Sequence, residues 1–296
     1  MEVLTQLVIG LAVGSAYSLI AVAVVLVFKG TKSLSIAMGE IGAFGLFVGL
    51  KWQKEGMPFV GWRPSALVTG LIAIVLGGLL GLLVERLVMR PLVQRPPLDG
   101  VIATLGVALF LALMELELFG RAAQFVPSPV GDGRVKVLGA TLTAPRIAAL
   151  ISAALVALAL FLFLSRTRFG LATRAATSDP TVARLLGVRV NRVYVFAWGV
   201  GGALAGLAAT LLGPSFGGLT PFAQTQFGLR ALAGAVIGGL DNIWGAILGS
   251  LLVGVIEAQV AQFIDINGAA EAAVLLLVVG TLLVRPRGLL GATGAG

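Results

Sequence analysis

The chain has 296 residues, of which 58% are hydrophobic and 11% are charged, with a formal net charge of +8. Soluble domains carry about 25% charged residues, so this composition excludes a soluble fold and predicts a protein embedded in a lipid bilayer. The sequence has no cysteine and no histidine, which excludes disulfides, thiolate nucleophiles, imidazole bases and metal sites built on those side chains. No cofactor is expected, and no lysine follows a glycine, so the chain has no P-loop for ATP.

Apolar segments long enough to cross a bilayer follow one another along the chain. A helix needs roughly 20 apolar residues to span the hydrocarbon core. Eight segments are predicted to be transmembrane helices: 7–28, 34–50, 66–86, 100–119, 146–165, 194–213, 243–262 and 268–284. The segment 226–240 is short for a full crossing, which leaves eight or nine spans. We therefore predict an all-α fold, a polytopic transmembrane helix bundle that forms a single domain over residues 1–296.

The distribution of basic residues predicts the orientation of this bundle. With the N-terminus outside, 13 of the 21 lysines and arginines fall in cytoplasmic segments and 7 fall outside, while Arg230 stays unassigned. An excess of basic residues marks the cytoplasmic side, so we expect the N-terminus outside and the C-terminus in the cytoplasm. The positive charge then reports topology, and nucleic acid is not an expected partner.

Glycine and proline interrupt the apolar segments in two ways. The run 213–221 contains three glycines and two prolines, and such a stretch cannot face lipid with its backbone unpaired. It predicts an outer loop or an irregular segment that lines a cavity. Glycines also recur at a spacing of four, as in Gly10 and Gly14 or Gly234 and Gly238, which permits close helix packing. Packing within one bundle is the favoured interpretation, and a dimerisation role is the alternative.

Polar side chains inside the apolar segments are candidates for a transport pathway, because ionisable groups at membrane depth are costly and are usually functional. The candidates are Glu40, Glu257, Gln259 and Glu271. Hydrogen bonding between helices is the alternative role for Glu257 and Glu271.

Three further acidic residues are expected at the membrane boundaries. Glu115 and Glu117 are two residues apart, so they cannot both face one cavity, and both are expected near the outer end of their helix. An interfacial position explains them as well as a substrate role does. Glu85 is expected to pair with the adjacent Arg86 at the inner boundary.

The cytoplasmic segment 166–193 contains the pattern of a short capped helix. Ser178 or Asp179 can cap a helix that has Pro180 in its first position and stops at Gly187. Its apolar residues Val182, Leu185 and Leu186 fall on one face, and Arg184 points elsewhere. Such a helix can dock a soluble partner, although a surface helix beside anionic lipid headgroups would have the same pattern.

Four stretches of the chain resemble one family of transport proteins. They are 10–21, the cytoplasmic loop, 235–249 and 285–291, which together resemble branched-chain amino acid ABC importer permeases of the LivH type. The resemblance implies a coupling helix that inserts into a cleft of the ATPase subunit, formed by Asp179, Pro180, Ala183, Arg184, Leu185, Leu186 and Gly187. One difference is Met38, which stands where members of the family often have histidine.

The resemblance also implies the partners and the location. The expected partners are ATP-binding cassette subunits, a second homologous permease that is identical or different, and a solute-binding protein outside the membrane. The expected location is the inner membrane of a prokaryotic cell, and the expected role is transport rather than catalysis, with a branched-chain or related hydrophobic amino acid as the solute. Two alternatives stay open: a permease for urea or short amides, and a stand-alone ion-coupled transporter or channel that uses embedded carboxylates.

Overall fold

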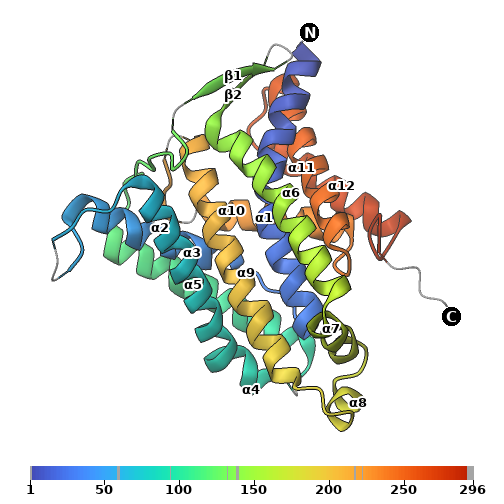
Figure 1. Cartoon of the computed structure of the whole chain (residues 1–296). Helices are drawn as coiled ribbons and strands as arrows, with labels where there is room; N and C mark the ends of the chain where they lie inside the picture. The colour runs from blue at the N-terminus through green and yellow to red at the C-terminus, as the bar shows by residue number, and fades with distance from the viewer. Residues whose placement is uncertain are drawn as a thin grey trace.

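The computed structural model describes residues 2–58, 61–93, 95–131, 133–137, 140–216, 218–221 and 223–291. Helices make up most of the fold, as Figure 1 shows. In chain order they are α1 (Glu2–Thr31), α2 (Met38–Glu55), α3 (Ala66–Val84), a π-helical turn (Glu85–Met89), α4 (Arg90–Leu92), α5 (Pro97–Phe119), α6 (Ala144–Arg166), α7 (Arg168–Ser178), α8 (Pro180–Leu185), α9 (Val190–Leu212), a 3-10 turn (Gly213–Phe216), α10 (Ala223–Gly238), α11 (Ile243–Phe263) and α12 (Ala269–Val284).

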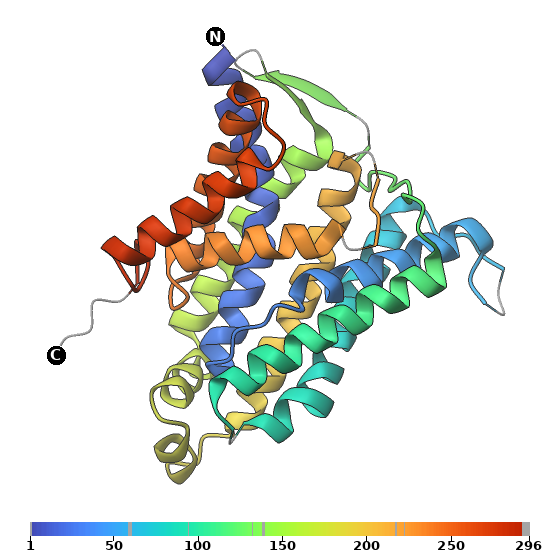
Figure 2. The same cartoon turned by 180° about the vertical axis from the view of Figure 1, so that it is seen from behind.

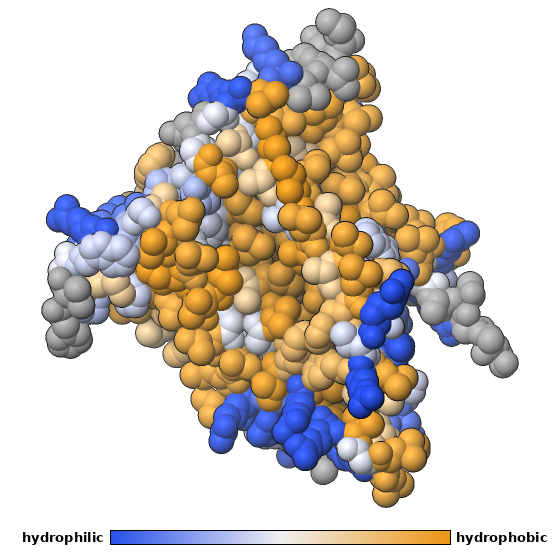
Figure 3. Space-filling view, viewed as in Figure 1, coloured by the Kyte–Doolittle hydropathy of each residue, from blue (hydrophilic) through white to orange (hydrophobic). Residues whose placement is uncertain are grey.

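Among the described residues, six helices are long and apolar enough to cross a membrane: α1, α3, α5, α6, α9 and α11. Large hydrophobic side chains on α3, α5 and α6 remain exposed, and Figure 3 shows an apolar surface around the middle of the molecule. Exposed apolar surface of this extent is stable in lipid and not in water. The prediction of a multi-pass membrane protein is therefore confirmed.

The other three predicted segments are also helices, but they are shorter or more polar than a full span requires. Helix α12 has 16 residues and α10 has 16 residues. Helix α2 begins at Met38 rather than at residue 34, and it ends in the polar sequence Lys51–Glu55. By length and composition alone, the helices do not reach the predicted count of eight or nine spans.

Helix α1 lies at the centre of the bundle, and glycines bring its backbone against α11. A Cβ atom added to Gly254 on α11 would lie 2.5 Å from the backbone of Gly14 on α1. Helices α3 and α9 meet in the same way at Gly77 and Gly202. These glycine contacts lie within one chain, which confirms the interpretation that the repeated glycines serve packing inside a single bundle.

Helix α10 runs across the bundle instead of along it, as Figure 2 shows. It packs against α11, α1, α2 and α12. The preceding segment contains the 3-10 turn at Gly213–Phe216 and a bridge in which Leu219 exchanges two backbone hydrogen bonds with Gln124. This pairing satisfies backbone groups of the glycine- and proline-rich run, so the chain can enter α10 among the other helices.

The fold departs from the all-α prediction at one place. Strands β1 (Arg134–Val137) and β2 (Ala140–Thr143) pair as a two-stranded antiparallel sheet. Figure 1 shows this sheet at the same end as the N-terminus, opposite α8. The two strands are rich in valine and threonine, which favour this structure, and they lie outside the apolar helices.

Candidate functional site

A network of charged side chains surrounds Arg230 of α10. Its Nε atom lies 3.0 Å from Glu257 of α11, and its Nη2 atom lies 2.7 Å from Glu271 of α12. The Tyr17 hydroxyl of α1 donates a hydrogen bond of 3.0 Å to the second oxygen of Glu257. Four helices thus contribute to one cluster, which we call the Arg230 network: Tyr17, Arg230, Glu257 and Glu271.

The members of the Arg230 network differ in their exposure. The side chains of Arg230 and Glu257 are 15% and 18% exposed, whereas that of Glu271 is 59% exposed. Arg230 and Glu257 therefore form an anchored pair, and Glu271 is the accessible partner. The network combines one positive and two negative charges, so it keeps an excess of negative charge that can attract a cationic group.

The sequence predicted part of this network and missed its centre. Glu257 and Glu271 were pathway candidates, and the structure brings them together through Arg230, which had no assigned position. Gln259, the third candidate on these helices, donates a hydrogen bond of 3.1 Å to the backbone oxygen of Val3. It links α11 to the start of α1. The spacing along the sequence could not reveal the network, because its members lie on four different helices that meet only in the folded bundle.

A second polar cluster lies between α2, α5 and α10. Glu40 is 1% exposed and accepts a hydrogen bond from the Thr225 hydroxyl. Glu115 is fully buried and lies close enough to Glu40 for their carboxyl groups to be coupled electrostatically, although neither Glu115 oxygen has a hydrogen-bond partner among the described residues. Gln224 is also buried, and within the part of the chain that the structure describes neither polar atom of its side chain has a hydrogen-bond partner. Glu40 is thus enclosed by polar groups from two other helices.

Glu115 lies near the end of α5 as expected, but its side chain is fully buried instead of exposed at an interface. Glu115 points into the bundle toward Glu40, and Glu117 is exposed on the other side of α5. The opposite orientations follow from their spacing of two residues, as predicted. The face of α5 that packs on α2 could be identified only from the tertiary structure.

At the end of the molecule opposite the N-terminus, the chain forms the short helix α8 as its sequence predicts. Asp179 accepts hydrogen bonds from the backbone nitrogens of Thr181 at 2.7 Å and Val182 at 3.0 Å. Pro180 occupies the first helical position, and Gly187 has a φ of 83°, a conformation that favours glycine and ends the helix. Helix α8 is therefore defined by its own local sequence.

The residues of α8 divide into an anchored and an exposed group. Ala183 is buried in a small core that also contains Ala176, Val190 and Tyr194. Leu185 and Leu186 are 83% and 76% exposed, and Val182 is half exposed. Figure 3 shows this end of the molecule with hydrophobic and hydrophilic surface side by side. Leu185 and Leu186 therefore form a small apolar patch on the surface of α8.

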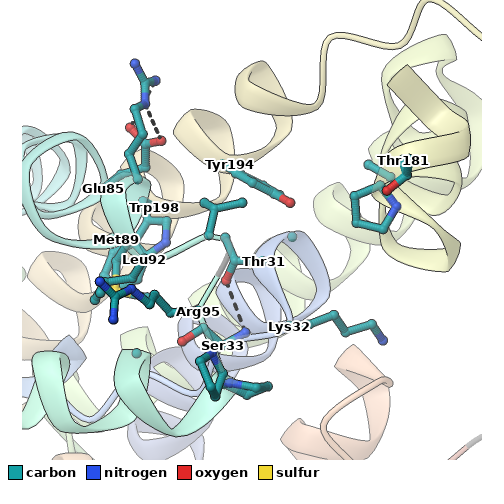
Figure 4. Close-up of a pocket in the computed structure, with 18 of the residues that line it drawn as sticks. Thr31, Lys32, Ser33, Glu85, Met89, Leu92, Arg95, Thr181, Tyr194 and Trp198 are labelled. Atoms are coloured by element: carbon teal, nitrogen blue, oxygen red, sulfur yellow. Dashed lines mark hydrogen bonds and ion pairs between the residues drawn. The ribbon is translucent and has the colours of Figure 1, made fainter. Parts of the chain in front are cut away.

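A pocket of about 390 Å³ lies between α8, the end of α1 and the π-helical turn. Figure 4 shows Thr31, Glu85, Tyr194 and Thr181 around this cavity. Arg184 and Arg90 also line it, so one side of α8 faces a partly basic space.

The expected pair of Glu85 and Arg86 is wrong, because Glu85 bonds Arg90 at 3.3 Å. The two residues are five positions apart, and the backbone between them forms a π-helical turn with hydrogen bonds from residue i to i+5. This turn places Arg90, instead of Arg86, beside Glu85. Turns of this type often occur at functional sites.

The apolar belt, the glycine-packed helices, the embedded charges and the exposed short helix at one end together define a polytopic membrane transport protein. Its chain matches the family described as "Branched-chain amino acid transport system / permease component" over residues 6–284. The protein therefore belongs to this family of permease components, as the resemblance predicted.

Individual relatives cover almost the whole chain. The high-affinity branched-chain amino acid transport system permease protein BraD of Pseudomonas aeruginosa is 33% identical, over 97% of this chain and 95% of its own. The corresponding permease protein LivH of Escherichia coli strain K12 is 30% identical over the same shares. Among solved structures, PsaBC from Streptococcus pneumoniae in complex with Fab matches with a TM-score of 0.48 and 13% identity, over 93% of this chain and 89% of that chain.

Proposed function

We propose that this chain is the transmembrane subunit of an ABC importer that carries branched-chain or related hydrophobic amino acids across the inner membrane of a prokaryotic cell. The observation that carries the proposal is the family match over residues 6–284, together with relatives of that name along almost the whole chain. In this role the chain would form the pathway, and partner subunits would hydrolyse ATP.

The segment 166–193 would couple the permease to its ATP-binding cassette subunit. In this proposal the exposed residues Val182, Leu185 and Leu186 enter a cleft of the ATPase, and Arg184 lies beside them. Asp179, Pro180 and Gly187 hold the two ends of α8, and Ala183 anchors it to the bundle. Support comes from the exposed leucines and from the local caps, since a coupling element must be exposed and rigid.

The pocket beneath α8 provides a route by which motion of the ATPase would reach the bundle. Closure of the ATPase subunits would push α8 toward the end of α1 and the π-helical turn, which line the same cavity. Lys32, next to the end of α1, also forms an ion pair of 3.1 Å with Asp241, in the turn between α10 and α11. A shift of α8 would therefore move the end of α1 and, through this ion pair, the turn between α10 and α11. The ATPase subunits would contact α8 differently in the inward- and outward-facing states, and this difference in binding free energy would drive the change between the two states.

We further propose that the chain forms one permease domain with eight or nine crossings, of which α10 would supply the ninth although it lies across the bundle. The N-terminus would then lie outside and the C-terminus in the cytoplasm. The proposal is supported by the position of the N-terminus opposite α8 and by the basic residues of the segment around α8 (Figure 1). A second permease, identical or different, and an external solute-binding protein would complete the importer.

The pathway would use the polar groups held at depth. Glu40 of the second polar cluster and Glu257, Gln259 and Glu271 of the outer half are the proposed residues. The proposal is supported by the free-energy cost of placing ionisable groups among apolar helices, because such groups are usually retained only where they have a function.

Affinity purification of this subunit in mild detergent, after coexpression with its partners, tests the proposal. We expect an ATPase to remain bound and to hydrolyse ATP, and we expect Leu186→Asp or Arg184→Glu to leave the permease folded but to abolish stimulated hydrolysis. Leu98→Asp is the matched control, because Leu98 is also an exposed leucine but lies on α5, outside the α8 segment. Recovery of the chain alone, with uptake driven by an ion gradient, would overturn the importer and favour a stand-alone transporter.

A further inference from the structure

The Arg230 network borders a groove of about 430 Å³ between α10 and α12. One part of its lining is charged, with Arg230 and Glu271. The rest of the wall is mostly aliphatic, with one polar side chain, and consists of Gln226, Leu229, Ala233, Val274, Leu275 and Val278. The groove thus places one positive group, one negative group and an apolar wall next to one another.

We propose that this groove binds the transported amino acid, with the substrate carboxylate on Arg230, its ammonium group on Glu271 and its aliphatic side chain on the apolar wall. The inference rests on the proposed function and adds where and how the substrate is held. A zwitterionic aliphatic amino acid matches all three parts of the groove.

The binding mode is an exchange of ion pairs. Arg230 and Glu271 form an ion pair of 2.7 Å across the groove. A zwitterion can insert between them, so that each side chain exchanges its partner for the opposite charge of the substrate. The exchange adds no net charge, and it therefore avoids the cost of an unpaired ion at membrane depth.

In this exchange of ion pairs, Arg230 is the fixed residue and Glu271 is the movable one. Arg230 uses its Nε atom to hold Glu257 at 3.0 Å, and Tyr17 holds the same carboxylate from α1. A guanidinium group has five donor hydrogens, so Arg230 keeps donors for a substrate carboxylate while it stays anchored. Glu271 is 59% exposed and lies in the first turn of α12, where it can move away from Arg230.

The same arrangement disfavours uncharged solutes. Urea and short amides carry no charge to replace the contact between Arg230 and Glu271, and they leave the aliphatic wall uncovered. An analogue that lacks one of the two charges would leave either Arg230 or Glu271 without an ion-pair partner. A site that bonds a polar group of its substrate strongly rejects analogues without that group. The groove therefore selects for both charges and for an aliphatic side chain.

Protection of a single cysteine tests the groove, because the natural chain contains no cysteine. Ala233→Cys is introduced into the permease, and the purified complex with its partner subunits is labelled with a small maleimide. We expect leucine to slow labelling, and we expect leucinamide and 4-methylpentanoate to have no effect at the same concentration. Leu276→Cys is the matched control, since Leu276 is exposed on α12 but lies outside the groove lining.

Glu271→Gln in the Ala233→Cys background tests the assigned contact without removing the anchored pair. The leucine concentration that protects the cysteine should rise roughly 10- to 100-fold, because a charged hydrogen bond to the ammonium group is lost. The proposed binding site would be contradicted by absence of leucine protection, by equal protection with all three compounds, or by an unchanged protective leucine concentration in Glu271→Gln. If any of these occurs while the complex still hydrolyses ATP and imports leucine, the proposed function stands and only the groove fails.

Discussion

Helices α8 and α10 are both too short to span a membrane upright, but they have opposite surroundings. Helix α8 lies at the end of the bundle with Leu185 and Leu186 exposed, and its ends are capped by Asp179 and Gly187. Helix α10 crosses the interior and bonds neighbouring helices through Thr225 and Arg230. Local sequence therefore determines α8, whereas contacts with neighbouring helices determine the position of α10.

The comparison also separates two kinds of function. An exposed helix with local caps can change its surface residues without affecting the fold, so it suits a contact that forms and breaks with a partner. In a buried helix that carries charges, the free energy of unfolding depends on the ion pairs that those charges form. Each change of partner alters the energetic cost of keeping the ions away from water. The following substitutions test this distinction.

The largest effect is expected for Arg230→Leu. It leaves Glu257 without its cation, and breaking a buried ion pair in this way costs about 3–5 kcal/mol of unfolding free energy. Thermal unfolding of the purified subunit in detergent measures the change. The double variant Arg230→Leu with Glu257→Gln should recover much of the loss, because the charge that remains, Glu271, is 59% exposed, whereas Glu257 is only 18% exposed. A single variant as stable as the natural chain would mean that α10 is not held by its charges.

Gly254→Ala is expected to have the next largest effect, because the new methyl group would lie 2.5 Å from the backbone of Gly14. Overpacking of this kind costs about 1–3 kcal/mol, since α1 and α11 must move apart. Gly280→Ala on α12 is the control, because an added Cβ there meets no atom within 4 Å. The unfolding temperatures of the two variants should separate, and equal values would contradict close packing of α1 against α11.

Asp179→Ala should have a smaller and local effect. It removes an acceptor for the backbone nitrogens of Thr181 and Val182, and loss of such a cap costs about 1 kcal/mol. Hydrogen exchange of α8 should accelerate while exchange of α10 stays unchanged. Asp179→Asn retains a side-chain acceptor and serves as the control. Faster exchange throughout the bundle would show that α8 is not an independent local unit.

The smallest effect on stability is expected for Leu185→Asp. The side chain is 83% exposed, and surface substitutions of this kind usually change unfolding free energy by less than about 0.5 kcal/mol. The unfolding temperature should therefore stay constant, while binding of the proposed ATPase is lost in a pull-down assay. Unfolding at a lower temperature would indicate that Leu185 packs within the permease.

The sequence by itself determined the class of the protein, most of its helices and the short helix α8. These features depend on composition, apolar length and residues close together in the chain, such as Asp179, Pro180 and Gly187. The sequence also indicated Glu40, Glu257 and Glu271 as unusual, because a carboxylate in an apolar segment is visible without a structure.

Only the tertiary structure decided which of these groups meet. Arg230 joins Glu257 and Glu271, and Glu115 joins Glu40, through contacts between helices that are distant in sequence. The course of α10 and the π-helical pairing of Glu85 with Arg90 were also settled by the fold. The physical reason is that the rotation and crossing of each helix follow from packing against its neighbours, and the helix-forming pattern alone does not contain that information.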